Sequence, residues 1–253
     1  MRIFWKLSFI GFITFGIVLL FNKLGDGRVQ NTGAPPYAEP QEAAPEKVLL
    51  PLPWVRPDGP PKVGLQVGHW KNNELPAELS KLIGNTGASG GGKWEWEVNL
   101  KIAEQTKMEL EELGVVVELI PATVPPKYWA DVFIAIHADG SENKSKSGYK
   151  FAAPWRDFTG KAEKLVQNLE SEYEKATGLT KDPNVTRNMR GYYAFAWWRY
   201  EHAIHPMTTA TIAETGFLTN ISDQDLLIKR SEVSVAGLAN GIEKFLRETE
   251  LLK

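Results

Sequence analysis

Short runs of β-branched apolar residues alternate with longer amphipathic stretches over most of this chain. The apolar runs predict strands at residues 63–67, 115–120, 132–136, 148–151 and 209–213. The amphipathic stretches predict helices at residues 94–113, 159–177 and 232–246. Strands this apolar are buried on both faces, and their alternation with helices is typical of a mostly parallel or mixed sheet. The sequence therefore predicts a single α/β domain whose central sheet is flanked by helices.

The N-terminal part of the chain differs in composition from this domain. Arg2 and Lys6 precede an apolar run at residues 7–21, which is shorter than the roughly 20 residues of a comfortable bilayer span. We expect residues 1–24 to be an uncleaved membrane anchor, because no Ala-x-Ala cleavage site follows; the alternative is a cleaved secretory signal. The prolines after it predict a linker at residues 25–60, and the domain occupies residues 61–253.

The overall charge and the absence of cysteine narrow the choice of ligand. The formal net charge is −2, and the chain has no cysteine. Nucleic acid is not expected as a partner, because phosphate binding normally needs a basic surface. A disulfide, a thiol nucleophile and a cysteine-ligated zinc are all excluded.

Two histidines follow predicted strands at the same edge of the sheet. His69 comes two residues after the strand at 63–67, and His137 directly follows the strand at 132–136. Ligands of open α/β sheets bind beyond the carboxyl ends of the strands. A single histidine there is more often a hydrogen-bonded polar residue than a ligand. Two on neighbouring strands favour a zinc site, because zinc needs converging imidazole nitrogens.

The predicted helix at 94–113 offers a third ligand near its start. A helical wheel places Glu95 on the buried stripe with Val98 and Ile102, whereas Glu97 lies on the wet face. A buried carboxylate is unfavourable unless a positive charge compensates it, as zinc would. The alternative is that Glu95 caps the helix N-terminus and contacts water.

Glu214 ends the predicted strand at 209–213 and can face the same crevice as the histidines. A carboxylate beside a zinc ion can remove a proton from water and pass it to a leaving amine. The alternative is a strand-end glutamate that pairs with a surface lysine.

These residues occur in an order that resembles the zinc-dependent N-acetylmuramoyl-L-alanine amidases of bacterial cell walls. The matching motifs are Val67-Gly68-His69, Glu95 four residues before Asn99, Ile136-His137-Ala138 and Ala213-Glu214-Thr215-Gly216-Phe217. The resemblance covers residues 62–246 and implies a zinc site at His69, Glu95 and His137 with Glu214 as the catalytic residue. The chain departs from the family pattern at Trp70, where a glycine is usual, and at Asp139, where an asparagine is usual.

The resemblance implies an enzyme that hydrolyses the amide bond between N-acetylmuramic acid and L-alanine in peptidoglycan. We expect it in the cell envelope outside the cytoplasmic membrane, tethered by residues 1–24 or secreted after their removal. One alternative is another zinc peptidase or amidohydrolase. The other is a non-catalytic, membrane-tethered protein that binds peptidoglycan.

The segment at residues 187–205 is rich in aromatic and basic side chains. It could stack nucleic-acid bases, which the net charge disfavours, or it could pack on the core with its cations at the surface. The third interpretation is a groove wall that binds sugar rings and peptide carboxylates. Under that interpretation Arg199 and His205 are candidate substrate-binding residues.

Overall fold

The structure is a computed structural model that describes residues 54–73 and 75–253. The predicted anchor or signal at 1–24, and residues 25–53 of the predicted linker, lie outside the described residues. In the described part, no helix is both long and apolar enough to cross a bilayer. The described part of the linker lies against the domain, because the Arg56 guanidinium donates to both carboxylate oxygens of Asp131, at 2.6 and 2.8 Å.

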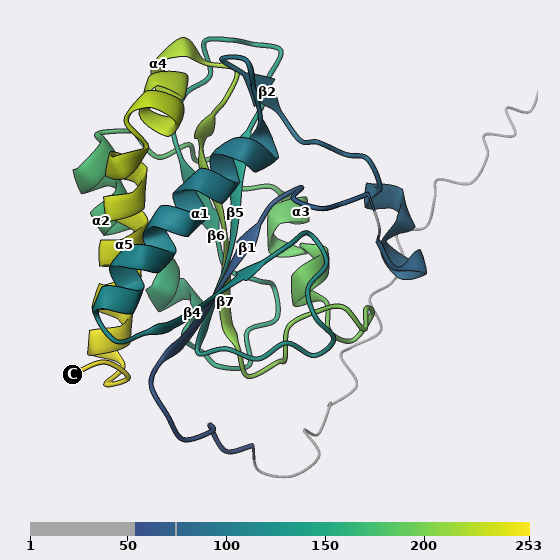
Figure 1. Cartoon of the computed structure of the whole chain (residues 1–253), viewed down its shortest axis with the longest axis vertical. Helices are drawn as coiled ribbons and strands as arrows, with labels where there is room; N and C mark the ends of the chain where they lie inside the picture. The colour runs from purple at the N-terminus through teal and green to yellow at the C-terminus, as the bar shows by residue number, and fades with distance from the viewer. Residues whose placement is uncertain (1–53, 74) are drawn as a thin grey trace, which may run out of the picture. The chain divides into compact units, whose positions relative to one another are not determined.

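A mixed, mostly parallel sheet forms the centre of the domain, as predicted (Figure 1). Its strands are β1 (Lys62–Val67), β4 (Val116–Ile120), β5 (Val132–Asp139), β6 (Lys150–Ala152) and β7 (Thr209–Phe217). The order across the sheet is β4-β1-β5-β7-β6. All neighbours are parallel except β6, which runs antiparallel to β7. The carboxyl ends of β1, β5 and β7 therefore meet at one edge of the sheet.

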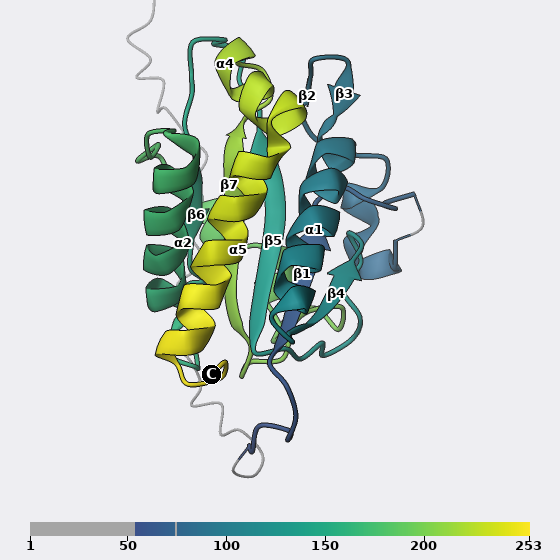
Figure 2. The same ribbon diagram turned by 60° about the vertical axis from the view of Figure 1, so that its left-hand side comes forward.

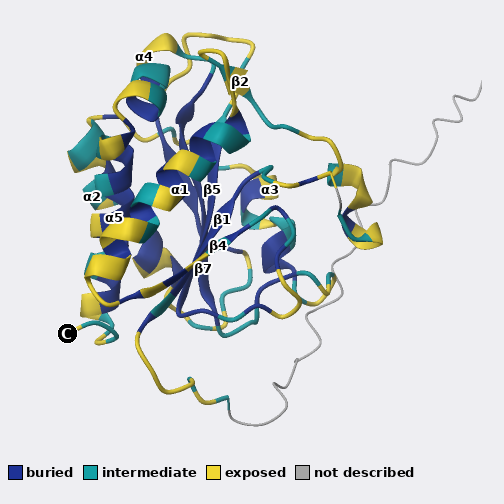
Figure 3. Cartoon of the chain, viewed as in Figure 1, coloured by how far each residue is buried: buried dark blue, intermediate teal, exposed yellow. Residues whose placement is uncertain are grey.

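One face of the sheet is covered by the three long helices. They are α1 (Glu95–Glu112), α2 (Ala162–Thr177) and α5 (Ser231–Glu248), which lie side by side across the strands (Figure 2). Alternate strand residues such as Leu65 and Ile134 face this layer and are fully buried. Figure 3 shows the result, with buried strands behind helices that are exposed only on their outer sides.

The other face is covered by the aromatic segment, through α3 (Arg187–Arg190) and the short 3-10 helix η2 (Tyr193–Phe195). Phe195 is buried here against Phe133 of β5, with ring centroids 6.4 Å apart. Packing on the core is therefore the correct interpretation for this part of residues 187–205.

The remaining elements are short. They are η1 (Ala77–Leu82), a hairpin of β2 (Ser89–Gly90) and β3 (Lys93–Trp94), α4 (Ile221–Gln224) and a π-helical turn, η3 (Asp225–Lys229). The sequence prediction missed them because a few residues carry no recognisable periodicity. Strands β5 and β7 are longer than predicted, since their pairing continues through His137 and Glu214. These two residues lie within strands rather than after them.

Candidate active site

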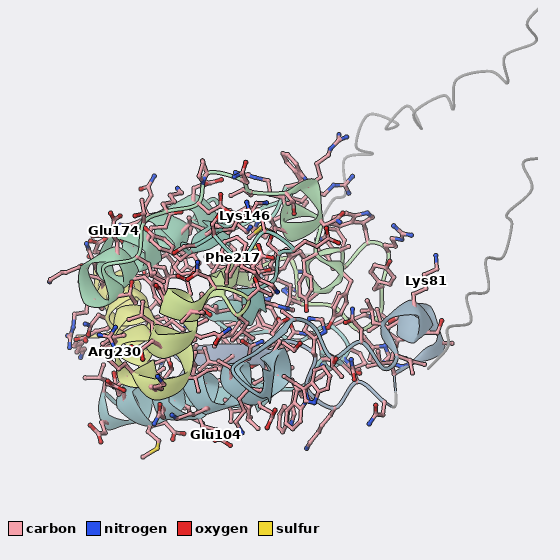
Figure 4. The ribbon with its side chains drawn as sticks, turned by 90° about the horizontal axis from the view of Figure 1, so that it is seen from above. Lys81, Glu104, Lys146, Glu174, Phe217 and Arg230 are labelled. Atoms are coloured by element: carbon pink, nitrogen blue, oxygen red, sulfur yellow. The ribbon has the colours of Figure 1, made fainter. Side chains whose placement is uncertain are left out.

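The carboxyl ends of β5 and β7 place His137 directly opposite Glu214 in the strand register. Side chains alternate between the two faces of a strand. His137 is therefore on the same face as Phe133, and Glu214 is on the same face as Ile212. Both side chains lie under the aromatic segment and not under the long helices. Figure 4 looks down on this end of the domain, with Phe217, the last residue of β7, near the middle.

His69 reaches the same place from the turn after β1. Its φ of 63° lies in the left-handed region, which turns the chain sharply after Gly68. Its Nδ1 lies 2.9 Å from the Asn85 carbonyl oxygen, and its Nε2 lies 3.5 Å from Glu95 Oε1. Burial lowers the pKa of His69. The imidazole is therefore neutral near pH 7, in the form that binds metals.

Glu95 is the first residue of α1 and is 3% exposed, as the helical wheel predicted. Its Oε1 lies 2.9 Å from His137 Nδ1 and accepts the Ala138 N–H at 3.2 Å, while Oε2 accepts the Ala88 N–H at 2.7 Å. Burial raises the pKa of Glu95, but the hydrogen bond and positive charge of His137 outweigh it, so the net pKa is lowered. Glu95 is therefore held as a carboxylate.

Helix capping, the alternative role considered for Glu95, belongs to Glu97. The Glu97 carboxylate accepts the Trp94 N–H at 2.9 Å and pairs with Lys93 at 3.1 Å. Glu95 is left free to point inward.

Two glycines make room for this cluster. A Cβ atom on Gly68 would lie 2.5 Å from the His137 ring, and one on Gly87 would lie 2.0 Å from Glu95 Oε2. Neither position can carry a side chain unless the cluster shifts. Gly87 belongs to the glycine-rich stretch before α1.

We expect Gly87→Ala to displace the Glu95 carboxylate and to weaken metal binding by about tenfold or more. Gly84→Ala is the matched control, because both glycines have φ of 73° but nothing lies within 4 Å of a Cβ on Gly84. Both variants carry the same backbone strain, of about 1–2 kcal/mol. Titration of the metal-free proteins with zinc separates displacement of Glu95 from the effect of backbone strain. Equal affinities in the two variants would contradict this account of Gly87.

The donor set fits a divalent metal ion. The ligand atoms of His69, Glu95 and His137 all lie within 4.8 Å of one another. Ligand atoms around a tetrahedral zinc with bonds near 2.1 Å are separated by about 3.4 Å. The His69–Glu95 separation of 3.5 Å matches this value, and the 2.9 Å His137–Glu95 contact needs only a small opening. The Asn85 carbonyl supplies the outer hydrogen bond that metal-ligating histidines normally make.

Glu214 lies beside this cluster without a partner of its own. Its Oε2 is buried and has no hydrogen-bond partner among the described residues. Burial raises the pKa of Glu214 to about 8, and the nearby Glu95 charge adds to the rise while His137 opposes it. The surface ion pair considered for this residue is absent from the described part of the chain. An unpartnered carboxyl with a pKa near neutrality is suited to proton transfer.

Asp139, one of the departures from the family pattern, has an ion-pair partner. Its carboxylate pairs with the ammonium of Lys150, which also lies 3.1 Å from Asp182. Lys150 stands opposite Glu214 in the strand register. Its positive charge lowers the pKa of Glu214 and so moderates the effect of burial.

Tyr192 also reaches the cluster, which the sequence did not predict. Its hydroxyl lies 3.3 Å from His137 Nε2, and the two rings meet edge to face with centroids 5.5 Å apart. Nothing distinguished Tyr192 from the other aromatic residues of the segment, since irregular structure has no period that assigns a side chain to a face.

The structure does not bring Arg199 and His205 to the cluster. His205 precedes β7 and lies beside Trp54, with ring centroids 5.8 Å apart. Glu214 is five residues beyond the start of β7 at Thr209, which corresponds to about 17 Å of strand. Arg199 packs on the Tyr200 ring and lines a surface hollow with Lys127 and Trp198. Arg199 and His205 therefore lie outside the cluster of His69, Glu95 and His137, and their role in substrate binding stays a prediction.

A comparison with protein families shows to which family the chain belongs. The family model described as N-acetylmuramoyl-L-alanine amidase matches residues 63–244, which include all four clustered residues. The chain belongs to this family. It is therefore an amidase that hydrolyses the bond between N-acetylmuramic acid and L-alanine in peptidoglycan, as the sequence predicted. Amidases of this family are metal-dependent and act outside the cytoplasmic membrane.

Solved amidase structures share this fold. The catalytic domain of CwlV from Bacillus (Paenibacillus) polymyxa var. colistinus is 19% identical, with a TM-score of 0.51, and the match covers 74% of this chain and 98% of that one. AmiC2 of Nostoc punctiforme is 18% identical, with a TM-score of 0.54 and coverage of 76% and 99%. Ami1 from Mycobacterium smegmatis is 13% identical, with a TM-score of 0.54 and coverage of 74% and 97%. No curated protein sequence matches the chain.

Proposed function

We propose that His69, Glu95 and His137 bind a zinc ion and that Glu214 transfers the protons of the amidase reaction. The observation that carries the proposal is the convergence of three metal-binding side chains beside an unpartnered glutamate. Two imidazoles and one carboxylate form a typical catalytic zinc set, which leaves one position open. The absence of cysteine favours this set over a structural zinc site.

In the proposed reaction, bound zinc supplies Lewis-acid polarisation and makes water a better nucleophile. Glu214 accepts a proton from the water that attacks the lactyl carbonyl carbon. The same carboxyl then donates this proton to the nitrogen of L-alanine as the C–N bond breaks. The products are the carboxylate of the muramic acid side chain and a stem peptide with a free amino terminus.

Two backbone N–H groups fix the Glu95 carboxylate for this role. Ala88 and Ala138 donate to different oxygens of Glu95, so the carboxylate cannot rotate freely. Such prior orientation reduces the entropy lost when a metal binds.

We expect Tyr192→Phe to weaken zinc binding by about tenfold, because it removes the hydroxyl beside His137 Nε2 but keeps the ring in place. Tyr149→Phe is the matched control, since the Tyr149 hydroxyl bonds to Glu170 and Glu174 of α2 and not to the cluster. Competition with a chromophoric chelator measures both affinities. An unchanged affinity in Tyr192→Phe, or an equal loss in both variants, would show that this hydroxyl does not position His137.

Digestion of purified peptidoglycan tests the reaction itself. The proposal predicts that the zinc-loaded protein releases intact stem peptides beginning with L-alanine, and that a chelator stops the release. Cleavage inside the stem peptide would instead indicate another zinc peptidase. Binding to peptidoglycan without any product would favour the non-catalytic alternative.

We also propose that residues 1–24 anchor the enzyme in the cytoplasmic membrane and that the linker carries the domain to the wall. The support is the apolar run with preceding positive charges in the sequence. Detection of the uncleaved chain in a washed membrane fraction tests the anchor against the cleaved-signal alternative.

A further inference from the structure

The side of the domain that the aromatic segment covers carries an unusual group of partly or largely exposed side chains. We call it the aromatic–basic surface; it comprises Lys127, Trp155, Arg156, Phe158, Trp197, Trp198 and Arg199. Two contacts place part of it near the starts of strands, whereas the Trp155 N–H donates to the Arg190 carbonyl, two residues before Tyr192. The Thr159 hydroxyl, next to Phe158, lies 3.2 Å from that of Thr209, the first residue of β7. Tyr128, which follows Lys127 and lies shortly before β5, donates its N–H to the Ala203 carbonyl.

The aromatic side chains of this surface are exposed although they are large. Trp155 is 61% exposed, Trp198 is 44% exposed and Phe158 is 41% exposed. Phe158 and Trp198 are connected through Trp197, which lies 5.5 Å from the Phe158 ring and 5.9 Å from the Trp198 ring between centroids. Clusters of exposed apolar side chains usually mark an interaction site.

The surface is also positively charged. Lys127, Arg156 and Arg199 form no ion pair with any described residue, whereas most other cations of the domain do. The Arg156 guanidinium lies 4.1 Å from the centroid of the Trp198 ring. Asp157, next to Arg156, accepts N–H groups of Thr159 and Ala162, and Glu201 lines the hollow with Lys127 and Arg199. Free cations beside exposed indoles match an anionic partner with an apolar interior.

The described part of the chain starts near this surface. Trp54, the first residue that the structure describes, packs on Trp129 and His205, with ring centroids 5.7 and 5.8 Å away. The described part of the chain therefore begins beside residues that adjoin the aromatic–basic surface.

We propose that the aromatic–basic surface docks on an anionic lipid bilayer. Tryptophans lie favourably at the level of lipid headgroups, and arginines and lysines bind the anionic phosphates. This membrane contact does not rest on the proposed function.

Vesicle co-sedimentation of residues 52–253 tests the proposal without the apolar run. These residues form one compact unit, and the solved chains of the CwlV catalytic domain and of AmiC2 consist almost entirely of the corresponding domain, so this part folds by itself. We expect it to bind phosphatidylglycerol vesicles at low salt and to leave phosphatidylcholine vesicles unbound. Trp155→Ala with Trp198→Ala, and separately Arg156→Ala with Arg199→Ala, should each weaken binding by about tenfold or more.

Matched controls come from other faces of the domain. Trp94→Ala removes a tryptophan that is 49% exposed next to α1, and Lys175→Ala with Lys229→Ala removes two cations of other elements. We expect all of these to keep vesicle binding, and thermal unfolding verifies that every variant is folded. Absence of binding by the folded wild-type unit would overturn the proposal. Equal losses in the controls would also overturn it, and so would binding to peptidoglycan sacculi that the same surface substitutions abolish.

Discussion

Glu214→Gln is expected to lower kcat for release of stem peptides by about 10²–10⁴-fold, the usual contribution of a general acid–base group. The amide has the shape of the carboxyl but can neither accept nor return a proton. Because burial already raises the pKa of Glu214 to about 8, the neutral amide should be tolerated without loss of fold. The variant should keep its zinc, since Glu214 is not one of the three proposed ligands.

Glu97→Gln is the matched control for that substitution. Glu97 lies two residues from Glu95 but faces solvent, where it caps α1. The Glu97→Gln variant should retain nearly all of the activity and lose only a small part of its free energy of unfolding. If Glu214→Gln hydrolysed peptidoglycan as fast as the wild type, Glu214 could not be the proton-transfer residue.

His137→Ala is expected to remove both the metal and the activity. It deletes one of the three proposed ligands and leaves Glu95 buried without its closest partner, 2.9 Å away. Loss of a direct ligand should weaken zinc binding by more than the roughly 10–100-fold that follows loss of an outer hydrogen bond. Elemental analysis of the purified protein, with a peptidoglycan assay on the same sample, measures both effects.

Two further variants distinguish loss of a metal ligand from unfolding of the His137→Ala protein. His69→Ala removes a ligand that is less buried than His137, so a folded, metal-free protein is expected even where His137→Ala unfolds. His202→Ala is the control, because His202 pairs with Glu78 at 2.8 Å outside the cluster. Loss of zinc from His202→Ala, or retention in both ligand variants, would place the metal elsewhere.

Much of the candidate site could be predicted because it depends on local rules. Glu95 was assigned to the interior from its place on the helical wheel, and the structure confirms that it is buried. His137 was expected at a carboxyl strand edge, and strand periodicity then fixes the face on which it lies. Helices α1, α2 and α5 were predicted within three residues at each end, since long amphipathic stretches give the clearest signal.

Other features depend on contacts between distant segments, which one sequence does not reveal. The order of the strands brings His137 beside Glu214, although they are far apart in the chain. Tyr192 and His205 come from the same aromatic segment, yet they lie at opposite ends of the sheet. No periodicity in that irregular segment indicated where it crosses from one end to the other. The fit of Gly87 against Glu95 likewise became visible only in three dimensions.

X-ray absorption at the zinc edge of the zinc-loaded protein tests the central claim most directly. The account predicts one zinc per chain with two imidazole nitrogens and a carboxylate oxygen at about 2.0–2.1 Å, plus one water oxygen in the open position. In His202→Ala this spectrum should be unchanged, and in His137→Ala it should be lost. A first shell without imidazole, or an imidazole signal that disappears in His202→Ala, would contradict the assignment of His69, Glu95 and His137.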